Sequence, residues 1–422
     1  MGDRLWLGFC VSVSVFLLFP ALGALGLVIV LVAVWSRHHR QLVRHSWDWV
    51  WISLSGLLIV GSILAEYPQA AWLGLANFLP YFLLFFALKR LILCSVQLRQ
   101  LAWILILPSL PIMVLGLGQM YLAWDTVALT QSILGWGLIP GGVPPQRMSS
   151  VFSYANLLAI YLAISLALTL GLGLEHRRQP TLNVIQQFCL ALIVLLDIIG
   201  IVLTSSRNAW GLSIFIITAY ALYLGWNWLV WSIVGGAIAV FWAAFVPSLG
   251  GTQLRYVVPD FVWLRLADSA YDRPIETLRI THWQFCWDLI QQRPWFGWGL
   301  RNFSPLYELK TGYWFGHPHN LWLMFAAETG IVTSVLLLAS VGRVMFRACQ
   351  LLLARREIAS SPIFFSYIVA FTSYIIFNLA DVSIFDLRIN TIAWVLLAAI
   401  DGVVAARASQ NYKSKINRSI LG

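Results

Sequence analysis

Residues 152–174 read FSYANLLAIYLAISLALTLGLGL and contain no charged side chain. A helix of about 20 apolar residues crosses the roughly 30 Å hydrocarbon core of a bilayer, so this stretch predicts a transmembrane helix. Eleven other apolar runs begin near Leu5, Ala21, Trp49, Ala71, Leu101, Leu182, Ala209, Trp228, Leu321, Ile363 and Ile389. We therefore expect an all-α polytopic membrane protein with about twelve transmembrane helices.

The composition of the whole chain agrees with this expectation. Of its 422 residues, 60% are hydrophobic and only 10% are charged, against about 25% charged in soluble domains. The first apolar segment is too long for a signal peptide and lacks a small-residue cleavage site, so we expect it to be retained. Pro20 divides the first two runs, which leaves open a single kinked span with a re-entrant piece.

The net charge of +10 follows the predicted topology rather than indicating a nucleic-acid partner. With both termini in the cytoplasm, most lysines and arginines fall on the inner side, as the positive-inside rule requires. The protein is accordingly expected to be a multi-pass membrane protein with both termini on the inner side. The basic residues on the outer side are arginines with one exception, Lys310, and arginine forks suit phosphate or carboxylate ligands.

One long segment lies outside the predicted spans. We expect spans 1–9 within residues 1–246, a large helical outward loop at 247–318, spans 10–12 within 319–407, and a cytoplasmic tail at 408–422. In the loop, Pro274 and Glu276 resemble a helix start and predict a helix over residues 272–292. Its apolar spacing would bury Ile275, Leu278, His282, Phe285 and Leu289, and would place Arg279, Trp283 and Cys286 on another side. A second outward stretch, residues 127–139, predicts a short interfacial helix.

The loop ends in His317-Pro318-His319-Asn320, at the depth where lipid headgroups meet water. A histidine with an ordinary pKa of about 6.5 suits a general base that takes a proton from a hydroxyl. On the residues alone, a packing role for the two histidines is favoured. A metal site has less support, because no outward cysteine or carboxylate completes a recognisable ligand spacing. No cofactor is expected.

Three arginines are candidates for binding an anion. Arg207 follows Thr204-Ser205-Ser206 at the outer end of a span, where hydroxyls and a cation could hold a phosphate. Arg147 precedes two serines in a similar setting, and Arg279 lies four residues before Trp283, a pairing suited to sugar and phosphate. On the residues alone, Arg207 could equally be an arginine that extends to the interface from a span end, and this interpretation is slightly favoured for Arg147. For Arg279 a solvated helix face is favoured.

Acidic residues within predicted spans keep a transport function open. Asp197 and Glu328 lie at depths where a charge is costly, and such carboxylates either mark ion pathways or bond to neighbouring helices. Asp381 and Asp386 flank the last outward turn and could pair with Arg388 or with an arginine of the loop.

Together these segments resemble the O-antigen ligase and O-antigen polymerase superfamily over about residues 147–388. Four motifs carry the resemblance: RMSSVFSYAN at 147–156, LTSSRNAW at 203–210, RPWFGWGL at 293–300, and His319-Asn320 followed by nine residues and Gly330. Their order, their sidedness and the long loop before His319 make the set specific.

The resemblance implies a protein of the inner (plasma) membrane whose loop at 247–318 is a large periplasmic loop. It also implies a metal-independent, inverting transfer of a glycan from a polyprenyl-pyrophosphate lipid to an acceptor hydroxyl on the outer face. By matching positions, His319 would activate the acceptor, and Arg207 and Arg279 would bind the pyrophosphate. Arg147 would be a second-rank phosphate or structural contact, and His317 would either tune His319 or stack on a sugar. Asn320 and Trp283 would be further substrate contacts. The expected partners are the lipid-linked glycan, a glycan or lipid acceptor such as a lipid A core, and the bilayer.

The chain departs from the family pattern at three places. Asn208 replaces a usual glycine, Tyr154-Ala155 replaces Asn-Pro, and Thr333 occupies a second glycine position. These departures leave the acceptor open, so a polymerase that uses a second lipid-linked glycan remains an alternative. A solute carrier of the bicarbonate type from the same superfamily is the other alternative, and Asp197 is its physical basis.

Overall fold

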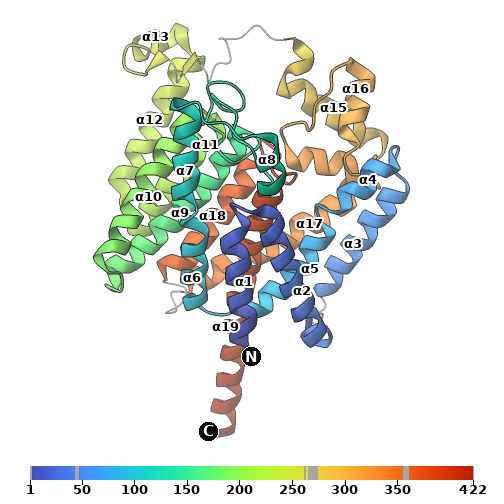
Figure 1. Cartoon of the computed structure of the whole chain (residues 1–422), viewed down its shortest axis with the longest axis vertical. Helices are drawn as coiled ribbons and strands as arrows, with labels where there is room; N and C mark the ends of the chain where they lie inside the picture. The colour runs from blue at the N-terminus through green and yellow to red at the C-terminus, as the bar shows by residue number, and fades with distance from the viewer. Residues whose placement is uncertain (1, 43–46, 261–262, 265–273, 355–360, 422) are drawn as a thin grey trace.

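The structure is a computed structural model that describes residues 2–42, 47–260, 263–264, 274–354 and 361–421. Within these ranges the regular elements are helices, and no strand occurs. The long helices stand together as a bundle with both termini at one end, and the short helices of the long loop lie toward the other end (Figure 1). The predicted all-α class is confirmed for the described residues.

A helix or a tandem pair of helices occupies each of the twelve predicted span positions. These elements are α1 (Gly2–Phe16), α2 (Pro20–Leu42), α3 (Asp48–Ile63), α4 (Pro68–Leu75) with α5 (Leu79–Leu91), α6 (Ser95–Ile106) with α7 (Ser109–Tyr121), α9 (Ala155–Arg178), α10 (Val184–Leu203), α11 (Arg207–Leu224), α12 (Asn227–Phe245), α17 (Leu321–Leu353), α18 (Pro362–Phe377) and α19 (Leu387–Leu421). Among the described residues, eight helices are long and apolar enough to cross a membrane, and three further apolar helices are shorter. The count of twelve crossings stays a prediction.

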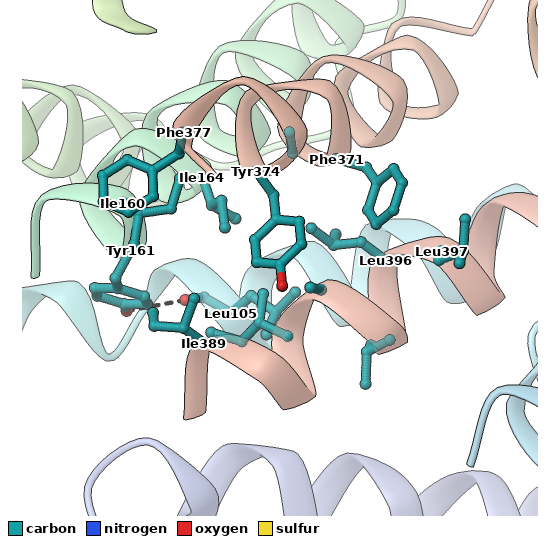
Figure 2. Packing of buried hydrophobic residues seen from close by; sticks show 14 of the residues in the cluster. Leu105, Ile160, Tyr161, Ile164, Phe371, Tyr374, Phe377, Ile389, Leu396 and Leu397 are labelled. Atoms are coloured by element: carbon teal, nitrogen blue, oxygen red, sulfur yellow. Dashed lines mark hydrogen bonds between the residues drawn. The ribbon is translucent and has the colours of Figure 1, made fainter. Parts of the chain in front are cut away.

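The centre of the bundle is formed by α9, α18 and α19. In its most apolar stretch α9 is 78% buried and α19 83% buried, whereas α12 is only 11% buried and lies at the periphery. Because α9 is apolar on all sides, it is suited to a position surrounded by other helices. Figure 2 shows this core, where the Tyr161 hydroxyl donates a hydrogen bond to the Leu105 carbonyl at 3.0 Å.

Short helices cover the end of the bundle that carries the loop. They are α8 (Ala128–Leu134), α13 (Thr252–Leu254), α15 (Arg279–Gln292) and α16 (Phe303–Thr311), with single turns at Pro247–Gly251 and Ile275–Thr277. The helix predicted at 127–139 is shorter than expected. It corresponds to α8 and has only seven residues, because Gly135 takes a left-handed conformation that ends it.

The predicted loop helix over 272–292 begins later than expected. Leu278 has an extended backbone, so α15 starts at Arg279, although it ends at Gln292 as predicted. Residue 272, the predicted start, lies outside the described residues. The predicted faces need correction as well: Ile275 is 70% exposed because it precedes the helix, and Cys286 is fully buried.

Candidate active site

The His-Pro-His-Asn segment lies directly before α17, and its last residue caps that helix. The Asn320 side-chain oxygen accepts the backbone N–H groups of Trp322 at 3.1 Å and Leu323 at 3.0 Å. These donors have no partner within the first turn of a helix, so the cap stabilises its start. Asn320 therefore anchors His319 at the beginning of α17.

His319 adopts a strained backbone conformation and faces a carboxylate. Its φ is +55°, in the left-handed region that side chains other than glycine rarely occupy. Its Nδ1 lies 3.4 Å from Oδ1 of Asp381, and the side chains are 26% and 7% exposed respectively. When Nδ1 carries the proton toward the carboxylate, Nε2 is left as the basic nitrogen of the ring. This is the arrangement of a histidine base oriented by an acid.

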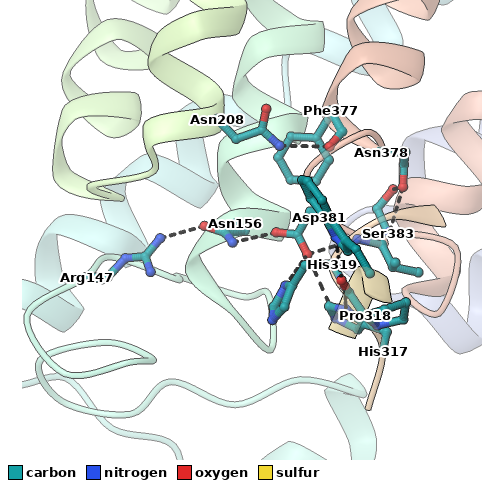
Figure 3. A network of polar contacts seen from close by, with 12 residues as sticks. Arg147, Asn156, Asn208, His317, Pro318, His319, Phe377, Asn378, Asp381 and Ser383 are labelled. Carbon is teal, nitrogen blue, oxygen red and sulfur yellow. Dashed lines mark hydrogen bonds and ion pairs between the residues drawn. The ribbon is translucent and has the colours of Figure 1, made fainter. Parts of the chain in front are cut away.

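Asp381 is held by a chain of hydrogen bonds that runs through Asn156 on α9 to Arg147 (Figure 3). Its Oδ2 accepts the Asn156 amide at 2.5 Å, and its Oδ1 accepts the backbone N–H of Val382 at 2.9 Å. Arg147 in turn donates to the Asn156 oxygen at 2.5 Å and to the Thr204 carbonyl at 2.8 Å. Arg147 is thus tied to the carboxylate that faces His319.

The environment of Asp381 favours its charged form. Burial by itself would raise the pKa of this carboxyl, but the hydrogen bond with His319, the attraction to both histidines in their protonated forms and the backbone N–H of Val382 outweigh burial and lower it. A buried carboxylate that stays ionised can stabilise an imidazolium when one forms on His319.

Two further histidines surround His319 and are held neutral. His317 Nδ1 accepts the backbone N–H of His319 at 3.2 Å, and its Nε2 lies 3.8 Å from Asp381. Burial, aided by the charge on His319, lowers the pKa of His317 to about 4 although Asp381 opposes this. His282 on α15 lies with its ring centroid 6.0 Å from that of His319, and burial likewise lowers its pKa to about 4. At neutral pH both are uncharged.

His317, His319 and Asp381 also form a group that could hold a metal ion, since one ligand atom from each lies within 4.8 Å of the others. The sequence offers no recognisable ligand spacing here, and the third member of the group comes from a distant segment. Asp381 is 62 residues from His319 along the chain, so no local spacing could reveal it.

The structure brings α15 against the His-Pro-His-Asn segment. Trp283 donates its indole N–H to the Pro318 carbonyl at 3.0 Å, so its polar edge fastens α15 to this segment. Arg279, the first residue of α15, is close enough to His282 and His317 for its positive charge to help lower their pKa values. Arg279 therefore lies beside the histidine cluster.

Arg207 is the first residue of α11 and lies three residues after Thr204, whose carbonyl accepts a hydrogen bond from Arg147. It is exposed, and the preceding Ser206 caps its helix. The next residue, Asn208, donates to the Phe377 carbonyl at 2.8 Å and so joins the start of α11 to the end of α18, shortly before Asp381 (Figure 3). The residue that departs from the family glycine thus has a structural contact.

The RPWFGWG segment at 293–299 packs against a break in α17. Gly330 has a φ of +81°, and a Cβ there would lie 2.1 Å from the Trp295 carbonyl oxygen. The loop replaces the helical hydrogen bonds lost at the break: Ile331 N–H donates to Pro294 at 2.8 Å, and Gly299 N–H donates to Glu328 at 2.8 Å. A backbone break inside a membrane is tolerated only where such partners exist.

The two acids predicted to lie within spans are both buried. The Glu328 side chain accepts the backbone N–H of Phe303 at 3.1 Å, which ties the loop to α17. Asp197 is fully buried beside the hydroxyls of Ser109 and Ser165.

Sequence reasoning missed several residues of this site. Asp386 pairs with Arg388 at 3.5 Å as expected, but Asp381 pairs with histidines rather than with an arginine. Asn156 and His282 were assigned to a span start and to a packing face. Arg301, whose guanidinium lies 5.0 Å from the Phe385 ring, was not singled out.

A family model described as O-antigen ligase matches residues 191–338. This match confirms the resemblance to that family and, with the apolar helices, supports a multi-pass membrane enzyme of the glycan ligase or polymerase kind. No curated protein matches the chain. A solved chain from "Structural coordination of polymerization and crosslinking by a peptidoglycan synthase complex" aligns with 90% of this chain and 96% of its own. Its identity is 16% and its TM-score 0.37, a likeness too low to carry an argument.

Proposed function

Because an O-antigen ligase family model matches residues 191–338, we propose that the chain transfers a glycan from a polyprenyl-pyrophosphate donor to an acceptor hydroxyl on the outer face of the membrane. The observation that carries this proposal is the His319–Asp381 pair at the start of α17, with Nδ1 and Oδ1 3.4 Å apart. A base of this kind is what an acceptor hydroxyl needs in order to attack a sugar.

The reaction we propose is a single displacement. His319 Nε2 takes the proton of the acceptor hydroxyl as the acceptor oxygen forms a bond to the anomeric carbon. The bond from that carbon to the pyrophosphate oxygen breaks, so the configuration inverts and the bonding electrons leave with the polyprenyl pyrophosphate. The imidazolium is stabilised by Asp381 and later returns its proton to water.

Arg207 and Arg279 would neutralise the charge that develops on the leaving pyrophosphate. Arg147, in contrast, would act through Asn156 and Asp381, because its guanidinium donates to Asn156 and to the Thr204 carbonyl. We assign Arg147 a positioning role. His317 would support His319 through the backbone contact between them.

Donor binding is tested with purified protein, a polyprenyl-pyrophosphate glycan and separate acceptors, without added metal. Arg279→Gln should raise the KM for the donor at least tenfold. Arg293→Gln is the matched control, because Arg293 lies at the end of the same helix but pairs with Glu66 at 2.9 Å, and it should leave that KM within about twofold. An unchanged donor KM in Arg279→Gln would refute the assigned role.

The ligase and polymerase alternatives share this chemistry and differ in the acceptor. Offering a lipid A core and a second lipid-linked glycan in parallel separates them by the product formed.

The transport alternative is tested with Asp197→Asn. We expect unchanged glycan transfer, whereas lost solute uptake with intact glycans would favour a carrier.

A further inference from the structure

A large cavity lies at the end of the bundle opposite to His319. Its volume is about 870 Å³, and its walls come from α1, α2, α3, α5, α17 and α19. The last of these helices begins at Leu387, near Asp381, and reaches the cavity at Asp401 and Ala405. With a rise of 1.5 Å per residue, Ala405 lies about 27 Å beyond Leu387. The cavity is therefore separate from the candidate active site, on the side predicted to face the cytoplasm.

The charged residues in the cavity wall leave an excess of positive charge. Lys89, Arg90, Arg343 and Arg347 line it together with two acids, Asp48 and Asp401. The Lys89 ammonium pairs with Asp48 at 3.0 Å, and the Arg347 guanidinium is 3.8 Å from Asp401. Arg343 and Arg347 are one helical turn apart on α17 and so lie on the same face. The wall therefore favours an anion.

Two buried polar groups point to the same conclusion. The indole nitrogen of Trp47 and the hydroxyl of Ser340 both belong to residues that line the cavity, and neither atom has a hydrogen-bond partner among the described residues. Both groups can donate a hydrogen bond, and a buried donor without an acceptor is costly. The Arg343 guanidinium lies over the Trp47 ring, 4.6 Å from its centroid. Neither atom is accessible to water in this conformation, so each side chain must turn toward the cavity before it can donate to an oxygen of an anion.

Apart from Ser409, the rest of the lining is apolar. Leu5, Val34, Trp51, Phe85 and Val344 form a hydrophobic wall beside the cations. A small soluble phosphate would leave this wall in contact with water, whereas a phospholipid brings acyl chains together with its phosphate. Basic pockets between transmembrane helices on the cytoplasmic side are suited to anionic lipid headgroups.

We propose that this cavity binds the phosphate of an anionic glycerophospholipid, with Arg343, Arg347, Trp47 and Ser340 around the headgroup and the acyl chains along the apolar wall. This inference does not depend on the proposed glycan transfer, because the cavity and the His319 site share no residue.

The test measures lipid binding to the delipidated full-length protein in detergent by native mass spectrometry and by thermal shift. The three probes are phosphatidylglycerol, phosphatidylcholine and soluble glycerol 1-phosphate. We expect binding and stabilisation by phosphatidylglycerol alone. Equal binding of phosphatidylcholine, or binding of glycerol 1-phosphate as tight as that of the lipid, would overturn the proposal.

Variants locate the binding. The double variant Arg343→Gln/Arg347→Gln should bind phosphatidylglycerol about thirtyfold more weakly, from the contribution of two basic residues near a membrane surface. Arg177→Gln is the control, because Arg177 is an exposed arginine near the end of α9 and outside the cavity. Ala405→Trp should block the site by filling it while keeping its charges. Wild-type affinity in both the double variant and Ala405→Trp would refute the assignment.

Discussion

Replacing Asp381 by asparagine removes the negative charge that faces His319 and nearly preserves the shape of the side chain. The separation of 3.4 Å between His319 Nδ1 and Asp381 Oδ1 determines how much attraction the transition state loses in this variant. Two unit charges at that distance attract by about 1 kcal/mol in bulk water and about 5 kcal/mol at an effective dielectric constant of 20. Because the His319 ring is 26% exposed, an intermediate value applies. A loss of about 2–3 kcal/mol corresponds to a kcat lowered roughly 30- to 150-fold.

Steady-state transfer by the purified protein measures this effect, with Asp386→Asn as the matched control. Asp386 lies in the same turn, but it pairs with Arg388 and accepts the backbone N–H groups of Arg388 and Ile389 at 3.0 Å each. Asparagine retains such a capping role, so this control should keep its kcat within about threefold. Melting temperatures of both variants show whether each remains folded.

A double variant separates orientation of the base from other roles of Asp381. If Asp381 acts only through His319, then His319→Ala/Asp381→Asn should be no slower than His319→Ala alone. A wild-type kcat in Asp381→Asn, or a further large loss in the double variant, would refute this reasoning.

Three further predictions follow from the surroundings of the site. Gly330→Ala should lower the melting temperature markedly, because φ is +81° and a Cβ would lie 2.1 Å from the Trp295 carbonyl oxygen. In the control Gly342→Ala the added Cβ has no atom within 4 Å, so the melting temperature should stay equal or rise. Thermal stability should fall as pH drops from about 6.5 to about 4, because buried His282 and His317 have lowered pKa values and the unfolded chain binds more protons in that window. If the melting temperature of a His282→Gln variant falls with pH as steeply as that of the wild type, the two histidines are not the cause. Transfer should persist in excess EDTA, and activity that is lost and then restored by Zn²⁺ would instead assign a metal to the histidine and aspartate group.

The helical bundle could be predicted from the sequence because its signal is local. Uncharged runs such as residues 152–174 are long enough to span a bilayer, and helices are found at every position predicted from such runs. The start of α15 could not be predicted, because the extended backbone at Leu278 has no signature in the pattern of Pro274 and Glu276.

Only part of the candidate site could be predicted from the sequence. His319 was found from its position after the loop and from the spacing to Gly330. Asp381 and Asn156 were missed as its partners because they come from distant segments, and only the packing of α9 and α18 brings them together. The RPWFGWG segment was recognised as a pattern, but its physical reason, the break in α17 at Gly330, became apparent only from the backbone contacts.

The central claim is that His319, oriented by Asp381, takes the proton of the acceptor. Its most direct test is single-turnover transfer by His319→Ala, with saturating donor and acceptor and with donor binding measured separately. General-base removal typically costs about 10²- to 10⁴-fold in rate, so we expect a loss in this range with donor affinity unchanged. A His319→Ala protein that transfers glycan at the wild-type rate would contradict the claim.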